Sequence, residues 1–136
     1  MSFVIDSSVA LAWLIPDEQG SPADALADSL EAGAACAPAL WLLEVGNALI
    51  MAQRRKRLTE RETELLLGTV ETLPVDLDTK SASDTVAAVT ACARRLGLTT
   101  YDAAYLELAQ RRGLPLATLD QRLADAARKI GVPVVP

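Results

Sequence analysis

The chain has 136 residues, 51% of them hydrophobic, and a formal net charge of −5, which predicts a single domain over residues 1–136 with a core of its own. It contains no histidine, which excludes Ser-His-Asp and Cys-His catalysis and disfavours a zinc site. The excess of acids argues against a basic nucleic-acid-binding surface, although carboxylates around divalent cations would still allow a nuclease. No apolar run is long enough to span a membrane, so we expect a cytoplasmic protein with no membrane partner.

Short apolar runs alternate with helical patterns along the whole chain. We predict strands at 3–5, 35–37, 73–77, 114–119 and 132–135. We predict helices at about 8–14, 21–32, 39–56, 60–72, 79–96, from 100 or 101 to 112, and 121–130. This alternation predicts a parallel sheet between layers of helices, with right-handed crossovers.

The two cysteines, Cys36 and Cys92, lie in apolar surroundings. Their positions do not match the spacing of metal ligands. We therefore predict buried free thiols rather than a disulfide or a metal site.

Three aspartates lie at junctions between strands and helices. Asp6 and Asp120 each follow an apolar strand directly, and ligands bind at the carboxyl ends of strands in open α/β sheets. Asp102 follows the potential caps Thr99 and Thr100, so it falls in the first turn of a helix, where the helix dipole favours an anion. Helix capping alone would also explain an acid at each of these positions.

Glu44 is a fourth candidate, because it is the only charge in the first three turns of an otherwise apolar helix. An ionised carboxylate there is costly unless something pairs with it. Asn47 shares its face of the helix, and a metal ion or a basic partner would explain the pair. The alternative is that Glu44 lies on an exposed strip.

A basic run, Arg54-Arg55-Lys56-Arg57, ends the same helix. Cations at a helix C-terminus complement the dipole, and such a run also suits contact with phosphates. Neither role excludes the other. Asp17 and Glu18, near the end of the first helix, are expected to be solvated loop residues.

The four acids can meet at one place. If the first and fourth strands are neighbours, Asp6 and Asp120 project from the same edge of the sheet. Asp102 starts a helix that leads into the fourth strand, and Glu44 lies soon after the second strand, so both can reach that edge. Carboxylates held this close repel one another, which raises a pKa or recruits a cation. Without histidine the fitting cations are Mg²⁺ or Mn²⁺, and such a site suits phosphodiester hydrolysis.

These motifs resemble those of PIN domains, specifically the VapC-type toxin ribonucleases of bacterial toxin–antitoxin pairs. The likeness covers nearly the whole chain, in four pieces whose order and separation make it specific. The pieces are Val4-Ile5-Asp6-Ser7-Ser8, Glu44 with Asn47 and Ala48-Leu49, the run from Tyr101 to Ala109, and Ala117-Thr118-Leu119-Asp120 with Leu123 and Ala126-Ala127.

The resemblance implies a PIN-like three-layer α/β/α sandwich whose five-stranded parallel sheet has the order 3-2-1-4-5. It also implies endoribonuclease activity that depends on Mg²⁺ or Mn²⁺. Carried over by position, the catalytic and metal-binding acids would be Asp6, Glu44, Asp102 and Asp120. Of these, Asp6 and Asp102 would bind the cation directly, and the other two would complete its shell directly or through water. A hydroxyl often accompanies the quartet, and the candidates are Ser7, Ser8 and Thr118.

The resemblance also implies partners. Members of this family are usually homodimers that a cognate antitoxin inhibits. We therefore expect an RNA substrate, an antitoxin and a second copy of the chain as partners. The apolar stretches 40–51 and 65–70 are candidates for the protein interfaces, although most of their side chains must belong to the core.

Other classes fit less well. A haloacid-dehalogenase-type phosphatase needs a second acid two positions after the first, where this chain has Ser8. A receiver-like domain needs a lysine after its fifth strand, and a dinucleotide-binding fold needs a glycine-rich turn after Ile5; neither is present. The strongest non-enzyme alternative is an inactive PIN domain that only binds a partner, and the intact acidic quartet argues against it.

Overall fold

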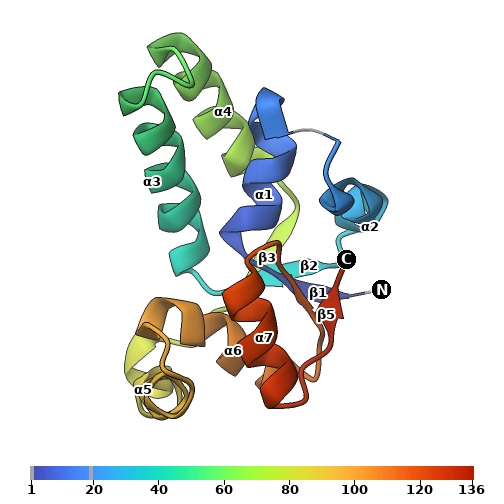
Figure 1. Cartoon of the computed structure of the whole chain (residues 1–136), viewed down its shortest axis with the longest axis vertical. Coiled ribbons are helices and arrows are strands. Elements are labelled where there is room, and N and C mark those ends of the chain that lie inside the picture. Colours follow the sequence, from blue (N-terminus) through green and yellow to red (C-terminus); the bar gives the residue numbers. More distant parts are fainter. Residues whose placement is uncertain (1, 19) are drawn as a thin grey trace.

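The structure, a computed structural model, describes residues 2–18 and 20–136 (Figure 1). Within these residues, five strands form one parallel sheet in the order β3-β2-β1-β4-β5, which confirms the order that the resemblance implied. The strands are β1 (Phe3–Ile5), β2 (Ala35–Ala37), β3 (Val75–Leu77), β4 (Leu116–Ala117) and β5 (Val134–Val135). β1 is central and pairs with both β2 and β4. The carboxyl ends of β1 and β4 are therefore adjacent.

Helices cover both faces of the sheet in three layers (Figure 1). Right-handed crossovers place the helices before β3 on one face and those after β3 on the other. The first layer holds α1 (Ser7–Leu14), α2 (Ala27–Glu31), α3 (Leu40–Arg54) and α4 (Glu60–Thr72). The second layer holds α5 (Ala82–Leu96), α6 (Thr100–Arg112) and α7 (Gln121–Lys129). In the described part of the chain, no helix combines the length and apolar character needed to cross a membrane.

The helices α3 and α4 form a hairpin that projects beyond the sheet (Figure 1). The two helices pack against each other, and α3 also packs on α1. The N-terminal end of α3 lies near the sheet, and its C-terminal end lies at the far end of the hairpin (Figure 1). Residues near the start of α3 can therefore reach the edge of the sheet, whereas those near its end cannot.

The core is centred on β1. Phe3, Val4 and Ile5 are each 0% exposed, because helices cover both faces of this strand. From α6, Tyr105 and Leu106 pack into the same core. Burial on both faces explains why the sequence shows a continuous apolar run here instead of alternation.

One segment differs from its predicted structure. The sequence predicts a single helix over 21–32, but the structure has a 3₁₀ helix at Pro22–Leu26 followed by the short α2. The Ser21 side chain accepts a hydrogen bond from the Ala23 N–H at 3.2 Å, and Pro22 has no N–H to donate. This local bonding favours the tighter helix at the start. The other predicted elements are present with small shifts of their ends.

The predicted helix boundaries rest on caps that the structure confirms. Thr59 and Glu62 form the expected capping box at the start of α4, with bonds of 3.0 and 3.1 Å. Gly97 ends α5 and Gly113 ends α6, both in the left-handed conformation at φ 66° and 63°. A side chain at either position would be strained, so glycine fits as the stop.

Cys36 and Cys92 are free thiols, as predicted. Cys36 is buried and Cys92 is half-buried. Burial raises the pKa of both thiols. Both therefore stay protonated at neutral pH, which disfavours thiolate chemistry.

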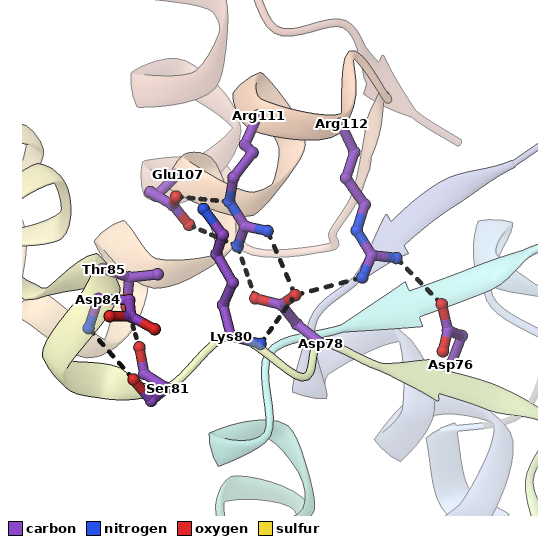
Figure 2. Close-up of polar contacts among 9 residues, drawn as sticks. All are labelled: Asp76, Asp78, Lys80, Ser81, Asp84, Thr85, Glu107, Arg111 and Arg112. Carbon is purple, nitrogen blue, oxygen red and sulfur yellow. Dashed lines mark hydrogen bonds and ion pairs between the residues drawn. The ribbon is translucent and has the colours of Figure 1, made fainter.

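An ion-pair network joins the C-terminal end of α6 to the segment after β3 (Figure 2). Arg111 contacts Asp78 at 2.5 Å and Glu107 at 2.8 Å. Arg112 contacts Asp76 at 3.0 Å and Asp78 at 3.2 Å. The Asp78 side chain is only 9% exposed, so these are not pairs between two solvated surface charges. The network holds α6 against the edge strand β3.

We expect Asp78→Asn to lower the free energy of unfolding by about 1–2 kcal/mol at neutral pH, because it removes a largely buried, charge-assisted pair. The Arg111 guanidinium holds the pKa of Asp78 below its usual range. The stability from this pair is therefore present at neutral pH and is lost as the pH falls through that lowered pKa. Urea unfolding of wild type and variant across this pH range is the measurement.

Asp125→Asn is the matched control for this prediction. Asp125 pairs with Arg128 at 3.3 Å, and both side chains are more than half exposed. Its loss should change the unfolding free energy by less than about 0.5 kcal/mol. Equal effects of the two variants, or a difference that does not depend on pH, would contradict the assignment of Asp78.

Candidate active site

Asp6 lies at the carboxyl end of β1 and is 4% exposed. Its Oδ1 accepts hydrogen bonds from the Val9 N–H at 3.3 Å, which caps α1, and from the Ser8 hydroxyl at 2.6 Å. Its Oδ2 accepts one from the Thr118 hydroxyl at 2.5 Å. Burial raises the pKa of Asp6, and the hydrogen bonds from Ser8 and Thr118 partly oppose that rise. Asp6 therefore caps a helix and also presents a carboxylate at the edge of the sheet.

Ser8 and Thr118 tie the ends of β1 and β4 together. The Ser8 hydroxyl accepts from the Leu119 N–H at 2.8 Å, and the Thr118 hydroxyl accepts from the Asp120 N–H at 3.0 Å. Of the three hydroxyls considered from the sequence, these two lie against Asp6. Ser7, the third, makes no side-chain hydrogen bond to any residue that the structure describes.

Glu44 lies in the second turn of α3 and is half-buried. Its Oε1 accepts a hydrogen bond from the Tyr105 hydroxyl at 2.5 Å. The sequence suggests a metal ion or a basic group as the partner of Glu44, and the observed partner is this neutral hydroxyl. Asn47 is exposed and forms no hydrogen bond with Glu44 in the described structure, so a shared role of the two residues stays a prediction.

Tyr105 is a site residue that the sequence did not single out. It lies on α6 and is 1% exposed, with its hydroxyl directed at Glu44. Burial, the bond to Glu44 and the negative charges of Asp6 and Asp102 all raise the pKa of Tyr105, so the phenol keeps its proton and donates a hydrogen bond to the carboxylate. Its position three residues after Asp102, on the same helix face, is the signal that could have found it.

Asp102 and Asp120 both lie at helix starts. The Thr99 side chain accepts a hydrogen bond from the Asp102 N–H at 3.1 Å, so Thr99 is the cap of α6. Asp120 caps α7 by accepting from the Arg122 N–H at 2.9 Å and the Leu123 N–H at 3.3 Å. Asp102 is half-buried and Asp120 is exposed. Burial, followed by the charge of Asp120, raises the pKa of Asp102.

The charges of the acids act on one another across four separate segments. Burial is the largest cause of the raised pKa of Glu44, and the charge of Asp102 adds to that rise. The charge of Asp120 adds in the same way to the raised pKa of Asp102. Asp6 acts on the Tyr105 hydroxyl, which also feels Glu44 and Asp102. Three of the acids, Asp6, Glu44 and Asp102, thus act on the Tyr105 hydroxyl, and Asp120 acts on Asp102.

The donor set suits a hard divalent cation, although the side chains do not form a closed metal site. Among residues 2–18 and 20–136, no three acidic, histidine or cysteine side chains are grouped closely enough to hold a metal ion. Every acid of the group nonetheless offers oxygen, which Mg²⁺ and Mn²⁺ prefer. Burial is the largest cause of the raised pKa values of Asp6, Glu44 and Asp102. A bound cation would stabilise the charged form of these carboxylates.

The basic run at the end of α3 lies far from these acids. Arg54 is ten residues beyond Glu44, which is about 15 Å along the helix axis. Arg57 forms ion pairs with Asp17 at 3.0 Å and Glu18 at 3.1 Å. These two acids are therefore ion-pair partners rather than merely solvated loop residues.

Comparison with known proteins identifies the family. The family model described as PIN domain matches residues 3–129. The chain is 31% identical to Ribonuclease VapC3 from Pyrobaculum aerophilum, over 92% of this chain and 94% of that protein. The chain therefore belongs to the PIN-domain family.

Solved structures share the same fold. PAE2754 from Pyrobaculum aerophilum matches with a TM-score of 0.67 and 26% identity, covering 99% of this chain and 91% of that one. FitAcB from Neisseria gonorrhoeae matches with a TM-score of 0.68 and 19% identity, covering 98% and 96% of the two chains. A toxin–antitoxin complex from Klebsiella pneumoniae matches with a TM-score of 0.61 and 20% identity, covering 99% and 97%. At such low identity, the last two are similar in fold alone.

We expect Tyr105→Phe to lower the free energy of unfolding by about 1 kcal/mol, because it removes the hydroxyl that satisfies Glu44 while keeping the buried ring. Tyr101→Phe is the matched control, since the Tyr101 ring is 64% exposed and its hydroxyl bonds to no described residue. Urea unfolding of both variants measures the difference. If the two variants are equally stable, the hydrogen bond to Glu44 does not contribute.

Proposed function

We propose that this chain is a metal-dependent endoribonuclease and the toxin component of a toxin–antitoxin pair. It would hydrolyse RNA phosphodiester bonds at a Mg²⁺ or Mn²⁺ site formed by Asp6, Glu44, Asp102 and Asp120. Membership of the PIN-domain family and the likeness to a protein named Ribonuclease VapC3 support the nuclease class. The single observation that supports the site is that Asp6, Glu44 and Asp102, from three separate segments, act on one buried tyrosine, while Asp120 from a fourth segment acts on Asp102.

Each acid has a role that follows from its surroundings. Asp6 and Asp102 would bind the cation directly, and Glu44 and Asp120 would complete its shell. When bound, a divalent cation supplies Lewis-acid activation and charge neutralisation for phosphodiester hydrolysis. Ser8 and Thr118 hold both oxygens of Asp6 in place.

Tyr105 supports this arrangement without contacting the substrate. Its bond of 2.5 Å holds the Glu44 carboxylate toward α6. Because Glu44 is on α3 and Asp102 is on α6, this bond fixes the two acids relative to each other. A neutral donor is needed here, since a cationic side chain would cancel the charge that attracts the metal.

We propose protein partners on the projecting hairpin. Leu43 is 78% exposed on α3, and Leu65 is 64% exposed on α4. Exposed leucines of this kind are common at protein interfaces when they gather on one surface. Both leucines lie within the stretches 40–51 and 65–70. In this proposal they contact the antitoxin or the second copy of the chain that the family resemblance implies.

An inactive PIN domain that only binds a partner is the alternative function. It would need the same fold and the same exposed leucines. It would not need the partly or fully buried carboxylates of Asp6, Glu44 and Asp102, whose pKa values burial raises and whose charged forms a cation would stabilise. A cleavage assay separates the two functions.

We expect the purified protein to cleave a pool of transfer, ribosomal and messenger RNA in the presence of Mn²⁺. Asp6→Asn should reduce the rate on the order of 10²-fold or more, because it removes a direct metal ligand. Asp28→Asn, an exposed aspartate in α2, is the matched control and should cleave like wild type. Cleavage of equal strength in wild type and Asp6→Asn would refute the assignment of the site.

We expect millimolar Mg²⁺ or Mn²⁺ to raise the melting temperature by several degrees, because the cation binds only the folded site. Without divalent cations, Asp102→Asn should be more stable than wild type by roughly a few tenths of a kcal/mol, since it relieves the burial and repulsion that raise the pKa of Asp102. The same variant should respond less to Mn²⁺. A purely helix-capping Asp102 predicts the opposite sign, and thermal unfolding at constant ionic strength tells the two roles apart.

A further inference from the structure

A groove of about 260 Å³ lies between α3, α5 and α6, and none of the four candidate acids lines it. Its walls come from the start of α3, the segment after β3, and the facing surfaces of α5 and α6. Most of the lining is apolar, with Leu40, Val86, Val89 and Tyr101 as its largest apolar side chains. Thr85 and Thr100 add hydroxyl groups to the same walls.

The groove and the candidate active site share two helices, α3 and α6. Tyr101 lines the groove and directly precedes Asp102 on α6. Leu40 lines it from α3, one helical turn before Glu44, and therefore on the same face of that helix. Two lining residues of the groove therefore lie within one helical turn of Glu44 and Asp102 along the chain.

Tyr101 is the most exposed aromatic residue of this chain. The chain has five aromatic residues, all within the described part. Phe3, Trp41 and Tyr105 are at most 1% exposed, whereas the Tyr101 ring is 64% exposed. An exposed ring beside a nuclease site is a platform on which a base can stack.

The charges in the groove do not repel a nucleic acid as strongly as its acids suggest. Asp78 and Glu107 both contact Arg111, and Arg112 also contacts Asp78, so these two cations offset part of the negative charge of the wall (Figure 2). Lys80 lines the groove, and it forms no ion pair with any residue that the structure describes. Its ammonium group is therefore available to a phosphate.

We propose that this groove binds one unpaired base of a single-stranded RNA, next to the phosphate that is cleaved, with the base stacked on Tyr101. The inference rests on the proposed ribonuclease function and adds a base-binding subsite to it. The groove is smaller than the roughly 300–1,000 Å³ of typical drug-sized ligand sites, which suits a single base rather than a folded RNA element. Lys80 contacts the adjoining phosphate.

The test measures RNA binding without cleavage. Fluorescence anisotropy in EDTA gives the Kd of wild type, Tyr101→Ala and Tyr101→Phe for a labelled single-stranded oligoribonucleotide that wild type cleaves with Mn²⁺. We expect Tyr101→Ala to bind about tenfold more weakly, because stacking on an aromatic ring is lost. Tyr101→Phe keeps the ring and should bind like wild type. Circular dichroism checks that both variants are folded.

A series of oligoribonucleotides with one abasic position each locates the base. Wild type should lose affinity at one position beside the cleaved bond, and Tyr101→Ala should not lose affinity there, because the contact is already absent. Lys80→Met should reduce the dependence of log Kd on log salt by about 0.7. Lys129→Met, an exposed lysine on α7, should leave it unchanged.

Unchanged RNA affinity of Tyr101→Ala, in a protein that cleaves RNA, would overturn the base-binding groove while leaving the ribonuclease function intact. If light scattering shows that the same variant has also lost self-association, the groove is a protein interface instead. Failure of wild type to cleave or bind any RNA would instead refute the proposed function itself.

Discussion

The structure depends on a carboxylate buried where β1 and β4 end. An ionised group in such a place is strongly unfavourable unless hydrogen bonds or an opposite charge compensate it. Here the hydroxyls of Ser8 and Thr118 bond to both oxygens of Asp6, and each hydroxyl also accepts from the backbone of the segment after β4. The bonds that stabilise the buried Asp6 carboxylate therefore also join the two strand ends. As a result, the central pair of strands and the candidate site stabilise each other.

The helix α6 carries much of what surrounds this carboxylate. Asp102 is in its first turn, Tyr105 follows one turn later, and Arg111 near its end is held by Asp78 on the segment after β3. The helix is thus fixed at its far end by ion pairs and along its length by the core. This support fixes the positions of Asp102 and Tyr105 relative to Asp6 and Glu44, which come from other elements.

Sequence patterns predicted the fold well, because each element has a local cause. The apolar run at 3–5, the capping box at Thr59 and the glycine stops act within a few residues, and each was confirmed. The candidate acids were found through their positions at strand and helix ends, and their catalytic role remains a prediction. The partner of Glu44 could not be found in this way, because Tyr105 is 61 residues away and only tertiary packing brings the two side chains together.

The hairpin of α3 and α4 has one more consequence. Glu44 belongs to this projecting arm, whereas the other three acids belong to the body of the protein (Figure 1). The Tyr105 hydroxyl is one link between arm and body there; the Trp41 indole N–H also donates to the Asp6 carbonyl at 3.2 Å, and Val45 is buried in the core. Glu44 therefore sits at the anchored root of the arm, where core packing sets its distance from the other acids, while the tip of the arm extends away from the sheet (Figure 1).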